Sequence, residues 1–250
     1  MLETLITTII KRPYVLMFLI SYVFIAIRVT NIKWTSLYLV AGYSIAFLSE
    51  FTSINYGYPY GWYFYKYENL MGEWLNNGVP VWDSVSYVFM CFSGLYTARY
   101  ILGSQQNKLK LILLSAVLVT ILDIIIDPVS HMGKRWFLGE IYYYPQPGFY
   151  FDITFANFCG WFLVSFLINS TGVYLLKFDQ LCKSTPLNNF LGIGLYFGIF
   201  GFGLIIAIYL QEIYLVLCDL GWLYLVLVIM LTNKSWGVIP QPFITHSEQN

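Results

Sequence analysis

Carboxylic acids interrupt the apolar segments of this chain. Glu50 ends one apolar run, Asp83 begins another, and Asp123 and Asp127 lie near the end of a third. The latter two are four residues apart, so a helix would place them on one face, with Asp123 about 6 Å further along the axis. Burial and a second carboxyl nearby both favour retention of one proton. A protonated acid beside an ionised one is suited to general acid–base chemistry.

Simpler interpretations compete with catalysis at several acids. A position at the water interface would explain Glu50 and Asp83, and it is the favoured interpretation for Asp152 and Glu212. Asp127 precedes a proline, so it is also consistent with a helix end. Asp123 lies a full turn inside an apolar run, which makes a functional role the stronger hypothesis there.

An aromatic segment follows the first of these acids and reads EFTSINYGYPYGWYFY. Aromatic rings alternate with other residues through Tyr58, Tyr60 and Trp62, which suits an extended segment with one aromatic face. The intervening glycines and proline allow the chain to turn. Ring faces stabilise cations, although an interfacial aromatic belt is the alternative interpretation.

Composition places these residues in a membrane protein. Of 250 residues, 58% are hydrophobic and only 10% are charged, and the formal net charge is zero. A soluble domain carries roughly 25% charged residues. The neutral balance gives no support to a nucleic-acid partner.

The elements that must position the acids are transmembrane helices, each needing about 20 apolar residues. We predict an all-α polytopic membrane helix bundle with about seven transmembrane helices, in a single integral membrane domain covering 1–250. The apolar runs lie at roughly 13–30, 34–52, 80–102, 109–127, 153–176, 188–210 and 213–232. Pro128 is expected to end the fourth span. Two Gly-, Tyr- and Trp-rich connections, about 53–79 and 128–152, are predicted to be re-entrant or interfacial loops.

The distribution of basic residues indicates an orientation. With seven spans, the side of the two long loops carries five Lys and Arg residues, and the opposite side carries eight. The positive-inside rule then places the second side in the cytoplasm. All the acids discussed above fall on the side of the long loops.

Several chemistries are disfavoured. The four cysteines form no CxxC pair, and the two histidines, His131 and His246, fall outside the predicted spans. Haem ligation between spans and a histidine-based hydrolase therefore have no support. The DIIID stretch resembles the magnesium-diphosphate motifs of membrane prenyltransferases, but only one such motif is present and few basic residues are near it. We expect no metal and no cofactor.

Acid chemistry on a long apolar alkene remains. An acid would protonate a double bond, aromatic faces would stabilise the tertiary cation, and water or another double bond would capture it. The first outcome is a hydration, and the second is a cyclisation. A third possibility is a non-catalytic membrane protein that binds a lipid or a pigment.

The chain resembles the membrane carotenoid biosynthesis protein family, which includes carotenoid 1,2-hydratases and bisanhydrobacterioruberin hydratases. The resemblance rests on four ordered blocks from Glu50 to Val164: EFTSINYGYPYGWYFY, GVPVW, DIIIDP and NFCGW. It implies cofactor-independent addition of water to the terminal double bond of an acyclic carotenoid or related polyisoprenoid. It also implies membrane lipids as surroundings, in a bacterial or archaeal cytoplasmic membrane.

Carried over by position, the resemblance marks Glu50, Asp123, Asp127, Trp136, Asn157 and Trp161. We hypothesise that Asp123 donates the proton and that Asp127 adjusts the acidity of Asp123, while Glu50 or Asn157 orients water. The predicted substrate-binding residues are Tyr58, Tyr60, Trp62, Asp83, Trp136 and Trp161. Asp83, Asp152 and Gly139-Glu140 depart from the family pattern, which leaves a cyclase or isomerase open as a variant of the same chemistry.

Overall fold

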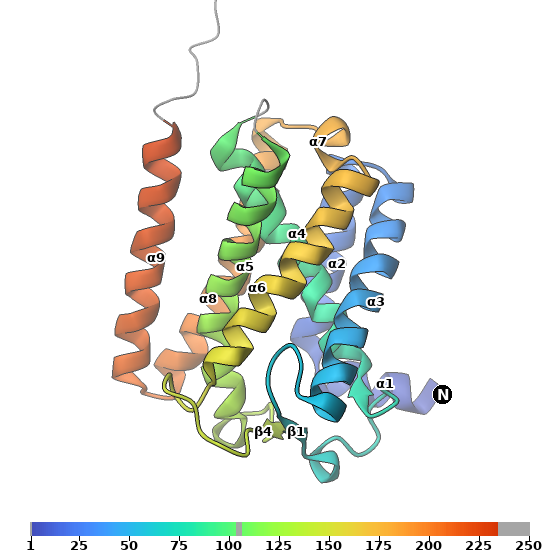
Figure 1. Cartoon of the computed structure of the whole chain (residues 1–250), viewed down its shortest axis with the longest axis vertical. Coiled ribbons are helices and arrows are strands. Elements are labelled where there is room, and N and C mark those ends of the chain that lie inside the picture. Colours follow the sequence, from blue (N-terminus) through green and yellow to red (C-terminus); the bar gives the residue numbers. More distant parts are fainter. Residues whose placement is uncertain (1, 104–106, 235–250) are drawn as a thin grey trace, which may run out of the picture.

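Long helices packed side by side make up the computed structural model, which describes residues 2–103 and 107–234 (Figure 1). The long helices are α2 (Pro13–Val29), α3 (Ile32–Tyr56), α4 (Val81–Leu102), α5 (Lys108–His131), α6 (Phe155–Ser170), α8 (Pro186–Tyr209) and α9 (Ile213–Lys234). The π-helical turn η3 (Thr171–Leu175) extends α6, and α1 (Leu2–Lys11) and α7 (Phe178–Leu181) are short. The prediction of an all-α polytopic bundle is confirmed.

Local sequence signals account for where several helices begin and end. The side chains of Asn31, Thr154 and Thr185 accept hydrogen bonds from the first turns of α3, α6 and α8. Such caps satisfy backbone donors that have no partner within the helix. α3 ends at Gly57, whose φ of 73° is left-handed and is readily adopted only by glycine.

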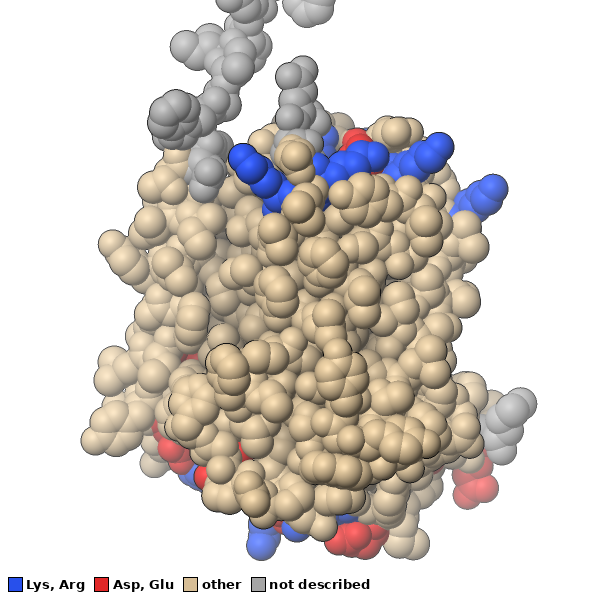
Figure 2. Space-filling view, viewed as in Figure 1, with Lys and Arg blue, Asp and Glu red and all other residues tan. Residues whose placement is uncertain are grey.

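Five of the described helices are long and apolar enough to cross a membrane: α3, α5, α6 with η3, α8 and α9. The count becomes six if α1 and α2, which meet at a 95° bend, form one broken span. On the face that Figure 2 shows, a broad region with almost no charged residues lies between the two ends of the bundle. The chain is therefore a multi-pass membrane protein.

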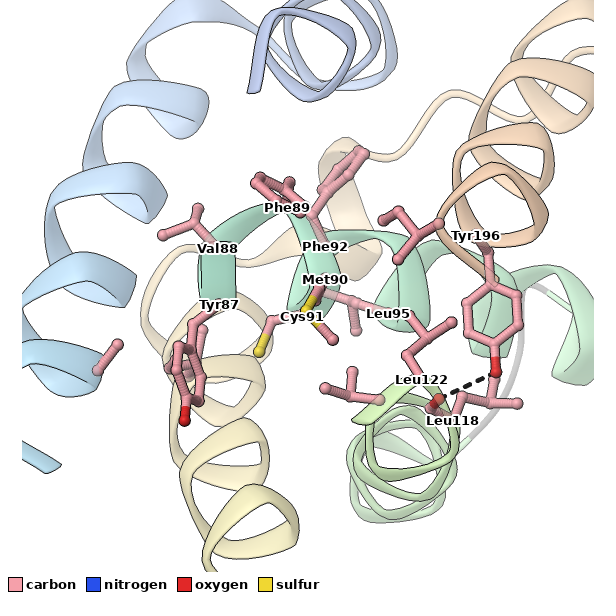
Figure 3. Close-up of a cluster of buried hydrophobic side chains, with 14 of the residues drawn as sticks. Tyr87, Val88, Phe89, Met90, Cys91, Phe92, Leu95, Leu118, Leu122 and Tyr196 are labelled. Atoms are coloured by element: carbon pink, nitrogen blue, oxygen red, sulfur yellow. Dashed lines mark hydrogen bonds between the residues drawn. The ribbon is translucent and has the colours of Figure 1, made fainter. Parts of the chain in front are cut away.

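α4 passes through the centre of the bundle and packs against α2, α3, α5, α6, α8 and α9. Leu95 of α4 lies beside Leu118 and Leu122 of α5, and Tyr196 of α8 donates a hydrogen bond to the Leu118 carbonyl at 2.9 Å (Figure 3). Gly94 allows this approach, since a Cβ there would lie 2.6 Å from Val119 Cγ2. On the other side of α4, the ring of Phe92 packs against Tyr22, Trp34 and Phe178. α4 is thus enclosed mainly by protein.

The expectation that Pro128 ends the fourth span is wrong. α5 continues to His131 with Pro128 inside it, and the amide of Met132 still donates to the Pro128 carbonyl at 3.0 Å. Proline removes only its own amide donor, and packing of the buried Val129 holds the last turn. Asp127 therefore lies inside a helix and not at its end.

The two long connections meet at one end of the bundle. β1 (Phe64–Tyr65) pairs antiparallel with β4 (Tyr142–Tyr143), which joins the two aromatic loops. β2 (Leu75–Asn76) and β3 (Val79–Pro80) form a second pair just before α4. The aromatic loops therefore cover the end of the bundle where the predicted acids lie.

Candidate active site

A cavity of about 110 Å³ lies beneath the two loops, between α3, α4, α5 and α6. Four carboxylic acids line it, and they come from three different helices: Glu50, Asp83, Asp123 and Asp127. Its aromatic wall contains Tyr14, Tyr60, Tyr63, Tyr65, Trp82, Tyr87, Tyr142, Tyr144 and Trp161. Among the described residues that line this cavity, none is a lysine or an arginine.

The first acid pair is Asp123 and Asp127, bridged by an amide. Asn157 lies in the first turn of α6. Its Nδ2 donates to Asp123 Oδ2 at 3.0 Å and to Asp127 Oδ2 at 2.8 Å. Both amide N–H groups are used in this way. One side chain from a neighbouring helix thus fixes the two carboxyls relative to each other.

Asp127 has further donors that Asp123 lacks. Tyr142 donates to Asp127 Oδ1 at 2.6 Å, and Tyr144 donates to Asp127 Oδ2 at 3.3 Å. Burial, reinforced by the nearby Asp127 carboxylate, raises the pKa of both tyrosines, so they remain protonated donors. Asp127 therefore has three hydrogen-bond donors that favour its ionised form, whereas Asp123 has one.

The second acid pair is Glu50 and Asp83, which both line the cavity and are close enough to interact electrostatically. Ser84 donates to Glu50, and Tyr65 donates to Asp83 at 2.8 Å. The cavity therefore holds two carboxyl pairs, each with its own donors.

Stacked rings form part of the cavity wall. Trp161 stacks on Tyr87 with ring centroids 3.9 Å apart. Tyr60 is 1% exposed and its hydroxyl lies 2.9 Å from Ser49 Oγ. Gly160 makes room for it, because a Cβ there would lie 2.3 Å from Tyr60 Cδ1.

Some residues selected from the sequence lie elsewhere. Tyr58 and Trp62 are 65% and 49% exposed and do not line the cavity. Trp136 is also outside the lining, and its Nε1 donates to the Val129 carbonyl at 2.7 Å. Tyr60, Asp83 and Trp161 do line it.

The remaining acids and histidines also lie apart from the cavity lining. Glu212 pairs with Arg135 near the bundle end. Asp219 is buried in α9 away from this lining. His131 packs against the rings of Tyr142 and Tyr144 at 5.6 and 5.9 Å, and His246 lies outside the described residues.

Sequence reasoning missed several tyrosines and one serine of the site: Tyr63, Tyr65, Tyr87, Tyr142, Tyr144 and Ser84. Tyr87 could have been found, because it lies four residues after Asp83 on the same helix face. The loop tyrosines carried no such signal, since their inward direction depends on the β1–β4 register.

The fold and the site together define a multi-pass membrane protein that encloses paired carboxyls in an aromatic cavity. The family described as carotenoid biosynthesis protein matches residues 11–228, so the chain belongs to that family. This confirms the resemblance seen in the sequence and extends it to both sides of residues 50–164. No curated protein and no solved structure gave a significant match. The chain thus has a role in carotenoid biosynthesis, which suggests an enzyme.

Proposed function

We propose that this protein hydrates the terminal double bond of an acyclic carotenoid without a cofactor. The observation that carries the proposal is the unequal environment of two neighbouring acids. Asp127 has three hydrogen-bond donors, and Asp123, 1% exposed, has only Asn157. Hydrogen bonds to the charged form favour ionisation, so the acid with more donors is the one that ionises. Asp123 therefore keeps the proton and faces the cavity as the acid.

The reaction balances with water alone. Asp123 transfers its proton to the less substituted carbon of the double bond, and the π electrons form the new C–H bond. The tertiary carbon is left as a cation, and a water oxygen bonds to it. The surplus proton of that water returns to the Asp123 carboxylate. One water is added for each end group, and the acid is regenerated.

The cavity walls suit the cationic intermediate. Tyr87, Trp161 and Tyr60 line the cavity together with the acids, and a cation over the face of such a ring is stabilised by about 0.5–2 kcal/mol. The ionised Asp127 adds an opposite charge nearby. Both effects act on the cation and not on the neutral alkene, which is the requirement for catalysis.

The second acid pair is suited to holding the attacking water. Both N–H groups of Asn157 are already donated to carboxylates. Glu50 and Asp83 offer carboxyl oxygens to the same cavity. We therefore assign the orientation of water to the Glu50–Asp83 pair and the orientation of the acids to Asn157.

Replacement of one acid tests the proposal. The wild-type chain, expressed in a bacterium that makes an acyclic carotenoid such as lycopene, should give pigment whose mass has increased by one water per reacted end. Asp123→Asn should abolish that product, because an amide cannot donate the proton. Asp219→Asn, which changes a buried acid outside the cavity, is the matched control and should retain turnover. Mass spectrometry of extracted pigment, with the amount of membrane-inserted protein, gives the readout.

Other results would identify the alternatives. Full turnover by Asp123→Asn would refute its role as the acid. Unchanged mass with a shifted retention time would indicate cyclisation or isomerisation by the same protonation. Pigment that co-purifies chemically unchanged with the wild-type protein would indicate binding without catalysis.

A further inference from the structure

The cavity is too small for a whole carotenoid. A cavity of about 150 Å³ is filled by a molecule the size of benzene, and this one measures about 110 Å³. It has room for an end group only. The rest of a long polyene must leave the cavity through its wall.

An apolar groove lies directly beyond one part of that wall. It measures about 220 Å³ and runs between α1, α2 and the start of α4, in the elbow where α1 turns away from α2 by 95°. Leu5, Ile9, Leu16, Leu19 and Val85 line it. Leu5 and Ile9 are 38% and 37% exposed, so the groove opens at the outer surface of the helices.

The groove offers little to a polar ligand. Its polar side chains are Thr8 and Arg12, and both are engaged. Thr8 donates to the Thr4 carbonyl at 2.8 Å and accepts from the Trp74 amide at 2.8 Å. Arg12 donates to Glu73 at 2.7 and 3.0 Å and to the Leu138 carbonyl at 2.6 Å. The surface therefore suits a hydrocarbon chain.

Trp82 separates the groove from the cavity, since it lines both. Its Nε1 donates to Glu73 Oε2 at 2.7 Å, and the Arg12 guanidinium lies over its ring, 4.7 Å from the centroid. Glu73 in turn pairs with Arg12. The indole is thus held in place by polar contacts on the side of the loops.

We propose that this groove binds the unreacted hydrocarbon chain of the polyisoprenoid whose end group enters the acid cavity, and that the chain passes the indole of Trp82. The assignment rests on the proposed function for the identity of the occupant. The position of the groove next to the cavity, across the single residue Trp82, the limited size of the cavity and the apolar lining of the groove support it.

Groove-filling variants test the proposal. Leu16→Trp and Val85→Trp each place a large ring in the groove, and Met17→Trp, on the same helix but 53% exposed and outside the groove, is the matched control. In the full chain carrying Asp123→Asn, both groove variants should lose lycopene that otherwise co-purifies with the protein, whereas Met17→Trp should retain it. Absorbance of the pigment relative to protein measures the loss without any turnover.

A short substrate separates chain binding from damage to the acid site. With Asp123 intact, the groove variants should hydrate a short acyclic monoterpene as well as wild type does, because it needs the cavity only. Unchanged lycopene retention in both groove variants would overturn the proposal, and so would equal loss of monoterpene and lycopene conversion. If wild type hydrates nothing but retention still falls only in the groove variants, the proposed function fails and the groove assignment stands.

Discussion

Tyr142 and Tyr143 are neighbours in the sequence but differ in what they contact. Tyr142 is 8% exposed and donates to Asp127, whereas Tyr143 is 42% exposed and its ring packs over Phe64. Strand residues alternate between two faces, so the β1–β4 register decides which hydroxyl reaches the acid. This pair provides a test of how strongly donors to Asp127 matter.

Tyr142→Phe should lower the hydration rate by about tenfold to a hundredfold, because a hydrogen bond to a charged group contributes about 1.5–3 kcal/mol. Tyr143→Phe should leave the rate unchanged. The measurement is initial product formation per amount of membrane-inserted protein. Equal rates for the two variants would show that the hydrogen bond from Tyr142 does not help to keep Asp127 ionised.

The sequence reveals the site only where spacing along one element determines proximity. Asp123 and Asp127 share a helix face by their spacing of four, and both line the cavity. Glu50 and Asp83 also reach it, but they come from two different helices, so spacing along one element does not predict that they meet there. Tyr58 and Trp62 looked equivalent to Tyr60, but the loop turns them outward.

At the scale of elements, α6 fits against the first aromatic loop at Gly160. A methyl group there would collide with the Tyr60 ring at 2.3 Å. Gly160→Ala should therefore destabilise the protein by about 1–3 kcal/mol. This corresponds to a fall in the midpoint of thermal unfolding of about 2–4 °C for each kcal/mol in a chain of this size.

Gly194→Ala on α8 is the control, because a Cβ there meets nothing within 4 Å. It should leave the midpoint unchanged or raise it slightly. Thermal unfolding of the detergent-solubilised protein gives both values. A Gly160→Ala protein as stable as wild type would mean that the loop can move away from α6 at little cost.

The bend between α1 and α2 is fixed by a buried ion pair. The side chains of Arg12 and Glu73 are 2% and 0% exposed. Glu73→Gln should destabilise the protein by about 3–5 kcal/mol, because it leaves the arginine buried and unpaired. The double variant Arg12→Met with Glu73→Leu should recover most of that loss.

The exposed pair Lys66–Glu140 provides the comparison, since its side chains are 27% and 31% exposed. Glu140→Gln should cost less than about 1 kcal/mol. Chemical unfolding of the four proteins in detergent gives the free energies. A double variant as unstable as Glu73→Gln would show that the ion pair itself stabilises the folded protein, beyond the cost of leaving Arg12 unpaired.

At the scale of the whole molecule, the two ends of the bundle differ in charge. Figure 2 shows Lys and Arg residues gathered at the end of α7, while the loop end carries both signs. The described residues at the first end include Arg28, Lys33, Lys108, Lys110, Lys177 and Lys183. We therefore predict that this end lies in the cytoplasm and that the aromatic loops face the other side.

Cysteine labelling in intact cells tests this orientation. In a background without the four native cysteines, Glu68→Cys at the loop end should react with a membrane-impermeant thiol reagent. Lys33→Cys at the basic end should react only after the membrane is permeabilised. The reverse pattern would place the acid cavity at the cytoplasmic face.

The helix bundle was predictable because apolar runs of span length leave few other folds. Which helix lies at the centre of the bundle was not predictable, because α4 carries polar residues and still occupies that position. Pro128 was misjudged for a related reason, since packing around Val129 sustains the last turn of α5.

The central position of α4 has a consequence for how the protein is made. Of its 22 residues, 16 are buried, including Ser84, Ser93, Thr97 and Arg99. α4 is synthesised before α5, α6 and α8, which later cover it. Until they arrive, its polar face is turned toward lipid or must stay near the translocation machinery. The final position of α4 in the membrane therefore depends on the insertion of helices that are synthesised after it.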